Sequence, residues 1–205
     1  MRLRSILTST LIALFFASNV TPALADAAKP GQSMTHIKTA AGVASTLEAA
    51  GVILYVQGGA TAGVIGDSLS SATSQYVFHI PVTANKAGVQ HLGSNIVFFN
   101  TANNQQLTLR NPVINLAKGV VSATIPQANN ASVDVLTITN ASTAKPKITN
   151  DRKAKMRTTA YTGTTLVLAP GVAATIATVL GLPAGSLPDG LAFGTADVTL
   201  YTKLK

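Results

Sequence analysis

The chain contains no cysteine and no tryptophan, and charged residues make up only 11% of its 205 positions. Without cysteine there are no disulfide bonds, thiol nucleophiles, iron–sulfur clusters or thiolate zinc sites. The scarcity of charge, beside 47% hydrophobic residues, excludes both a disordered chain and a charged coiled coil. The composition that remains is typical of a β-rich domain stabilised by ordinary packing.

No motif for hydrolytic chemistry is complete in this chain. Gly66–Leu69 read G-D-S-L, which resembles the nucleophile block of the lipases named for that tetrad. That family completes the site with a histidine near the C-terminus, whereas no histidine follows His91 here, so we interpret the tetrad as coincidental. A glycosidase needs two facing carboxyl groups; Asp67, Asp134 and Asp197 leave such a pair open, but no pattern favours it.

Motifs for metal or phosphate binding are missing as well. The three histidines, His36, His79 and His91, lack the H-x-x-x-H or H-x-H spacing of a local metal site. Gly58-Gly59 and Gly63 indicate a flexible loop, but no G-K-[ST] follows them. We therefore expect a protein without a bound metal and without enzymatic activity.

The N-terminal residues have the three parts of a secretory signal peptide. Arg2 and Arg4 precede an apolar run over residues 6–17, and Ala23-Leu24-Ala25 supplies small residues for cleavage. This run is short for a membrane span and no other stretch approaches the roughly 20 apolar residues needed, so we expect no transmembrane span after cleavage; an uncleaved anchor is the alternative. The prediction is export to the periplasm, cell surface or medium.

The rest of the chain predicts one domain that is mostly β. Residues 1–25 form the signal peptide, 26–40 an irregular linker and 41–205 the domain. Apolar spacing predicts two short helices, at about 41–50 and 170–180. Period-two patterns separated by turn residues indicate an antiparallel sandwich or partly closed barrel, with the helices at one end or over one face. The expected strands are 76–82, 95–100, 106–110, 113–116, 120–125, 133–139, 164–168 and 192–201.

A basic segment over residues 145–157 is the strongest charge feature, within a chain of net charge +8. Such a cluster can hold phosphate or an anionic envelope surface; a solvated, mobile loop is the other interpretation. Specific nucleic-acid binding is not expected, because no aromatic residue lies within the segment to stack on bases. Its cationic residues are Lys145, Lys147, Arg152, Lys153, Lys155 and Arg157.

Several short motifs resemble those of a group of small exported bacterial proteins of uncharacterised function. These motifs are F-x-I-P-V at 78–82, G-V-x-H-x-G at 88–93, L-x-L-R-N-P-x-I at 107–114, L-x-P-x-x-A-x-x-I at 168–176 and G-T-A-x-V-x-L at 194–200. The H-x-G before a strand is also distantly similar to the haem-transport-associated (Hta) domains of bacterial haem uptake.

The Hta resemblance implies a tyrosine that ligates haem with a histidine to support it. In this chain the histidine is His91, and Tyr55 or Tyr76 would be the axial ligand. The alternative is that His91 is a turn residue between Gly88 and Gly93 whose ring bonds a backbone carbonyl, and that the tyrosines are packing residues.

The sequence as a whole favours an exported, non-enzymatic binding or envelope-associated structural protein of unidentified ligand. The alternatives are a haem or small-ligand carrier of the Hta kind, and a protein that binds anionic surfaces through residues 145–157.

Overall fold

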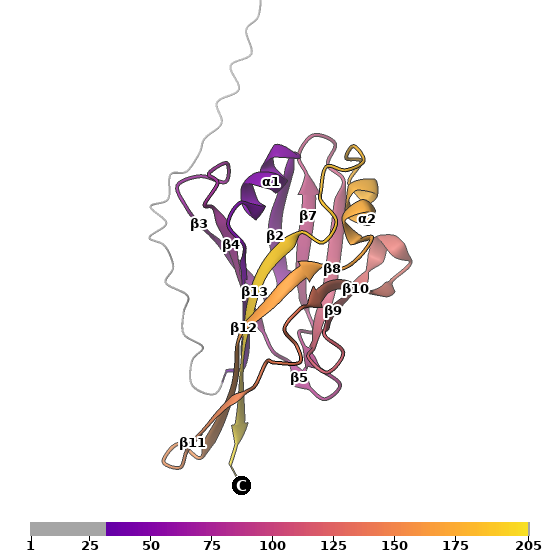
Figure 1. The fold of residues 1–205 in the computed structure, drawn as a ribbon. Helices are drawn as coiled ribbons and strands as arrows, with labels where there is room; N and C mark the ends of the chain where they lie inside the picture. Colours follow the sequence, from indigo (N-terminus) through magenta and orange to yellow (C-terminus); the bar gives the residue numbers. More distant parts are fainter. Residues whose placement is uncertain (1–31, 205) are drawn as a thin grey trace, which may run out of the picture.

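The computed structural model describes residues 32–204, so the predicted signal peptide lies outside the described residues. Within this range, thirteen strands form one antiparallel sheet that curls until it nearly closes into a barrel (Figure 1). Two short helices accompany the sheet. This confirms the predicted fold class.

The two helices lie within the predicted ranges, and both precede a glycine at positive φ, Gly51 and Gly181. The helices are α1 (Val43–Ala49) and α2 (Val172–Val179), and a short 3-10 turn spans Pro126–Ala128. The strands are β1 (Met34–Thr39), β2 (Val52–Gly58), β3 (Thr61–Ile65), β4 (Gln75–Pro81), β5 (Ala84–Asn85), β6 (Val89–Gln90), β7 (Ser94–Asn100), β8 (Gln106–Asn115), β9 (Val120–Ile125), β10 (Ala131–Ile138), β11 (Lys147–Asp151), β12 (Met156–Leu168) and β13 (Ala192–Lys203).

The seam of the barrel lies between β2 and β3. The strand order runs β2-β7-β8-β9-β10-β12-β13-β1-β4-β3, so the two end strands of the sheet are consecutive in the chain. They share no ladder, but the backbone N–H of Leu54 on β2 donates to the hydroxyl of Tyr76 on β4 at 3.3 Å. This side-chain bond links the two sides of the seam.

The core fills the barrel, and both helices lie at the same end of it, the top in Figure 1. Leu47 of α1 and Ile176 of α2 are each 1% exposed. A void of about 50 Å³ remains under α2, lined by residues that include Phe98, Leu136 and Phe193. Binding sites for small molecules have volumes of roughly 300 Å³ or more, so this void is too small for such a ligand. The interior of the barrel is filled by packed side chains.

The predicted linker over residues 26–40 is wrong in its second half, because residues 34–39 form β1. This strand pairs with β13 on one side and with β4 on the other. Its inward positions include two threonines, so the sequence shows no alternation of apolar and polar residues. Thr35 and Thr39 are tolerated inside because each has a partner: His91 for Thr35, and the N–H of Tyr76 for Thr39.

Two further expectations are corrected where the chain bends without ending a strand. The separate strands expected at 106–110 and 113–116 are one strand, because β8 continues through Asn111-Pro112 with a bulge, and Asn111 takes a left-handed φ of 50°. The expected glycine-rich loop at 58–63 is partly strand, since β2 extends to Gly58 and β3 begins at Thr61.

Candidate functional site

The basic segment is a β-hairpin rather than the expected loop. Strand β11 pairs with the first residues of β12, which pair in turn with the end of β13. This three-stranded extension, residues 145–161 with 199–204, is called the basic arm below. Figure 1 shows it projecting from the end of the barrel opposite the helices.

Local sequence explains why the arm is ordered as strands. The first part of β12 reads M-R-T-T-A-Y-T, and β-branched threonines favour extended backbone. The turn over 152–155 places Lys155 at a left-handed φ of 50°, and a carboxylate oxygen of Asp151 accepts the N–H of Ala154 at 2.9 Å. The N–H of Leu204 donates to the carbonyl of Lys155 at 2.9 Å, which joins β13 to the turn.

The arm concentrates positive charge on both of its faces and at its tip. Lys147 and Lys203 lie on one face, and Arg157 lies on the other, where its Nε donates to Asn150 Oδ1 at 3.2 Å. Asp151 is the only carboxylate in the arm. Its seven cationic residues, all exposed, are Lys145, Lys147, Arg152, Lys153, Lys155, Arg157 and Lys203.

Two surface hollows lie along this end of the molecule. One, of about 480 Å³, is at the tip of the arm and is lined by Asn150, Arg152, Lys155 and Leu204. The other, of about 400 Å³, is lined by residues that include Lys86, Tyr161, Ile114 and Leu200. The guanidinium of Arg152 and the ammonium of Lys155 only donate hydrogen bonds, and both carry positive charge, so the tip hollow suits a phosphate or carboxylate group.

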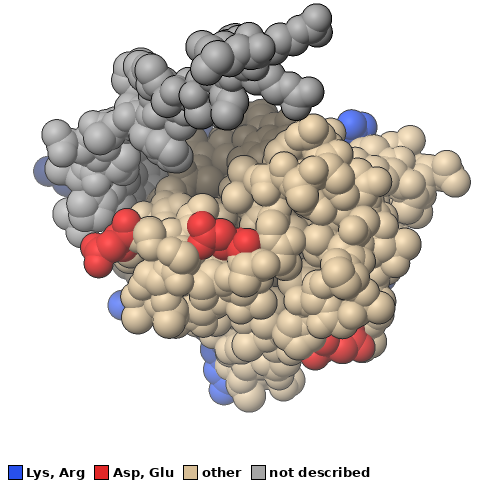
Figure 2. All heavy atoms as spheres, turned by 90° about the horizontal axis from the view of Figure 1, so that it is seen from above, with Lys and Arg blue, Asp and Glu red and all other residues tan. Residues whose placement is uncertain are grey.

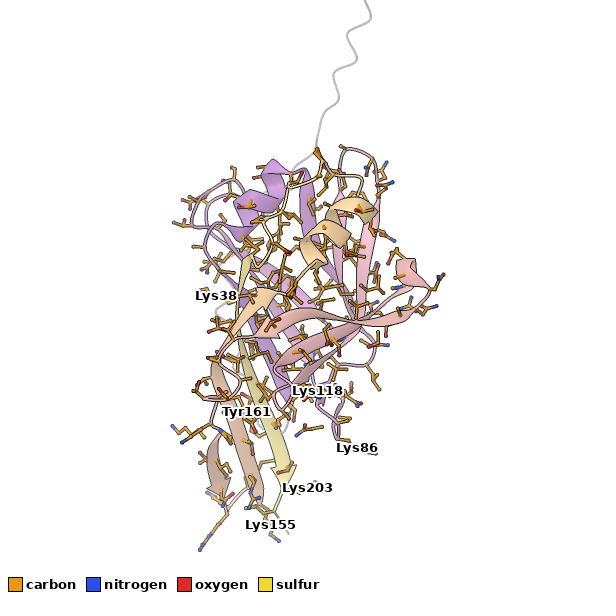
Figure 3. All side chains as sticks on the ribbon, turned by 45° about the vertical axis from the view of Figure 1, so that its right-hand side comes forward. Lys38, Lys86, Lys118, Lys155, Tyr161 and Lys203 are labelled. Carbon is orange, nitrogen blue, oxygen red and sulfur yellow. The ribbon has the colours of Figure 1, made fainter. Side chains whose placement is uncertain are left out.

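Charge of opposite sign gathers at the two ends of the barrel. Lys86 and Lys118 lie toward the same end as the arm, together with Lys155 and Lys203 (Figure 3). The opposite end, seen from above in Figure 2, shows carboxylates on its face, with Lys and Arg atoms at its outline. Glu48 belongs to α1, and Asp67 to the β3–β4 connection. The molecule is therefore polarised along its long axis.

The sequence does not identify Lys86, Lys118 and Lys203 as members of this site, because they lie 27 or more positions outside the basic segment. Lys86 and Lys118 are each isolated among uncharged neighbours, Lys203 has only Lys205 nearby in the sequence, and strand pairing brings the three to one end of the barrel. Consecutive charged residues can be recognised in the sequence, whereas charged residues that meet only at one end of the folded barrel cannot.

His91 lies inside the barrel, 1% exposed, with both ring nitrogens bonded. Its Nδ1 lies 2.8 Å from the carbonyl of Pro112, which can only accept, so Nδ1 carries the hydrogen. Its Nε2 therefore accepts from the hydroxyl of Thr35 at 2.7 Å. Burial lowers the pKa of His91, and the bond to Pro112 opposes this shift only in part.

Tyr55 and Tyr76 both line a shallow groove of about 290 Å³ at the seam, a groove that His91 does not line. The hydroxyl of Tyr55 donates to Gln106 at 3.1 Å, while the ring of Tyr76 is buried and stacks on Phe78 with centroids 6.0 Å apart. Burial raises the pKa of Tyr76, which disfavours the phenolate that ferric iron needs. These residues do not fit the tyrosine–histidine pair that the Hta resemblance implies.

The G-D-S-L tetrad lies in an exposed connection between β3 and β4. The hydroxyl of Ser68 is 2.9 Å from that of Ser70, and its carbonyl accepts from the hydroxyl of Ser74. The bonds of this serine therefore stay within its own turn.

No helix within residues 32–204 is long and apolar enough to cross a membrane. Comparisons with protein-family models, with curated proteins and with solved structures give no match to this chain. The resemblances to small exported proteins and to Hta domains therefore stay predictions.

Proposed function

We propose that this chain is an exported binding protein that attaches to a phosphate-rich, anionic surface of the cell envelope through its basic arm. The observation that carries the proposal is the gathering of seven cationic side chains against one carboxylate on a projecting three-stranded arm. The protein acts by attachment rather than by catalysis.

The position of the arm supports attachment to an extended surface. Because the arm projects from the barrel, cations on both faces and at the tip reach a surface without desolvating the core. Each lysine or arginine near an anionic membrane contributes about 1 kcal/mol. Acidic groups at the far end are repelled by the same surface, which favours an arm-first orientation.

Vesicle binding tests this function. We expect the full chain to sediment with vesicles that contain phosphatidylglycerol but not with pure phosphatidylcholine vesicles. Replacing Lys153→Gln and Lys155→Gln together removes about 2 kcal/mol, so the apparent affinity should fall about 30-fold. Raising the ionic strength should weaken binding of the parent chain, since exposed charges are screened beyond about 10 Å at 0.1 M salt.

The matched control is the double variant Lys38→Gln and Arg110→Gln, which changes the net charge equally at exposed positions. Lys38 lies away from the arm in Figure 3, and Arg110 lies on β8, which does not pair with the arm. It should bind within about twofold of the parent chain, because its charges do not meet the surface. Equal losses in the two double variants, or binding that ignores lipid charge, would overturn the proposal.

A further inference from the structure

Two histidines face each other across neighbouring strands on the outside of the barrel. His36 on β1 and His79 on β4 are directly opposed in the antiparallel register. Their Nδ1 atoms are 2.7 Å apart, and the rings meet edge to face with centroids 4.6 Å apart. One Nδ1–H therefore donates to the lone pair of the other ring, and both ring nitrogens converge on one point of the surface.

The next strand places a carboxylate in the same row. Asp197 on β13 is the register partner of His36 on its other side, and it is exposed. One oxygen, Oδ1, accepts the N–H of Gly163 at 2.6 Å, which fixes the carboxylate beside the pair. Lys38, two residues from His36 on the same face, is the nearest cation along β1. The row Asp197, His36, His79 thus carries one negative charge and two half-buried imidazoles.

The placement of the rings suits metal ligation, because the Nδ1 atoms of His36 and His79 already meet at one point of the surface. A neutral imidazole offers a lone pair to copper, nickel or zinc. A tetrahedral ion at 2.0–2.1 Å from each nitrogen would separate the two nitrogens by about 3.3 Å. To hold an ion, the two rings must rotate apart by that difference, and the hydrogen on one Nδ1 must move to the Nε2 of the same ring, which leaves both Nδ1 lone pairs free.

We propose that His36 and His79 form an open, two-histidine site for a divalent transition metal ion of the copper, nickel and zinc class. Asp197 supports the site by its charge from the adjoining strand. Within residues 32–204 no group of three or more histidine, aspartate or glutamate side chains converges on one ion. Water therefore completes the coordination, and the ion is exchangeable. This inference is independent of the function proposed for the arm.

Copper binding to the full chain, prepared without a histidine tag, tests the site. Electron paramagnetic resonance of the protein with one equivalent of Cu²⁺ should show a spectrum with superhyperfine lines from two nitrogens. Titration calorimetry should give one site per chain. His36→Gln or His79→Gln should each weaken the affinity at least tenfold, and the double variant should lose the two-nitrogen spectrum.

Two further variants distinguish metal binding at the histidine pair from a nonspecific effect of surface charge. Lys38→Gln, on the same face of β1, should leave the affinity within about twofold of the parent, whereas Asp197→Asn, which keeps an oxygen acceptor for Gly163, should weaken it several-fold. Thermal unfolding of each variant without metal checks the fold. His91 offers no competing site, since both of its nitrogens are bonded inside the barrel. A parent chain without saturable binding, or a double histidine variant that binds as the parent does, would overturn the proposal.

Discussion

At the scale of single residues, His91 ties three parts of the fold together. It lies between β6 and β7, donates to Pro112 in the bulge of β8, and accepts from Thr35 on β1, 56 residues away in the chain. Thr35 and His91 are 0% and 1% exposed. Buried polar groups are stable only when bonded, so the pair acts as a polar brace between β1 and the β8 bulge.

His91→Ala should lower the free energy of unfolding by about 3 kcal/mol. The variant leaves the Thr35 hydroxyl without its His91 partner, leaves the Pro112 carbonyl with only the backbone N–H of residue 91, and opens a cavity. Urea denaturation followed by circular dichroism measures the change. Thr35→Val keeps the shape and removes one partner, so it should cost less, and a His91→Ala variant as stable as the parent would contradict the brace.

The same residue makes stability depend on pH. Burial lowers the pKa of His91 in the folded protein, so the unfolded chain, with an imidazole pKa of about 6.5, takes up a proton more readily. Well above pH 6.5, His91 is neutral in both the folded and the unfolded chain, so its titration does not change stability. As the pH drops below 6.5 toward the lowered pKa of the folded protein, the unfolded chain binds the proton first, and the free energy of unfolding falls. His36 contributes in the same direction.

Urea denaturation between pH 7.5 and pH 5 measures this dependence. The parent chain should lose stability steadily on acidification, and His91→Ala should show a shallower slope because one titrating group is gone. A slope that is identical in the two proteins would exclude His91 as its source.

At the scale of elements, the pairing of β13 with β1 depends on a glycine at their junction. Gly194 lies opposite Thr39 in the register, at a φ of +152°. A Cβ added there would overlap the carbonyl oxygen of Lys38 and lie 2.6 Å from the Cα of Thr39. Both contacts are with backbone, which cannot move without separating the strands.

Gly194→Ala should destabilise the protein by about 3 kcal/mol or more, through overlap with β1. The matched control is Gly185→Ala, also at positive φ (+80°) but with nothing within 4 Å of the added Cβ. Its cost should be about 1 kcal/mol, from backbone conformation alone. Thermal and urea unfolding of the two variants gives the difference, and similar losses would show that packing against β1 is unimportant.

At the scale of the whole molecule, the opposed charges at the two ends predict a defined orientation on an anionic surface. The absence of cysteine allows a single one to be introduced for labelling. Ala154 lies in the turn of the arm, and Ala102 lies in the β7–β8 turn, where Asn103 bonds the carbonyl of Leu180 after α2.

A dye at Ala154→Cys should be quenched by a lipid-borne quencher when vesicles that contain phosphatidylglycerol are added. The same dye at Ala102→Cys should keep its emission, because the helix end faces away from the surface. Fluorescence titration measures both, and dye-labelled protein with pure phosphatidylcholine vesicles is the control. Equal quenching at the two positions would contradict an arm-first orientation.

Local periodicity and turn residues are enough to predict the fold class, the two helices and, in whole or in part, seven of the thirteen strands within residues 32–204. The period-two pattern of β4, ending at Pro81, and the glycine after each helix are local features of this kind. The cationic run at 145–157 was also visible, although its loop assignment was not, since charged β11 has no apolar face to indicate a strand.

The tertiary structure alone decided which distant residues meet. Strand β1 could not be recognised from hydrophobic alternation, because the inward-facing Thr35 is polar. Its hydroxyl is satisfied by His91, which lies 56 residues away in the chain. His36 and His79 have no motif spacing, yet antiparallel pairing makes them neighbours. Spacing rules describe ligands on one helix or one strand, whereas strand register joins residues at any separation, so the histidine pair and the charged end of the barrel emerge only on folding.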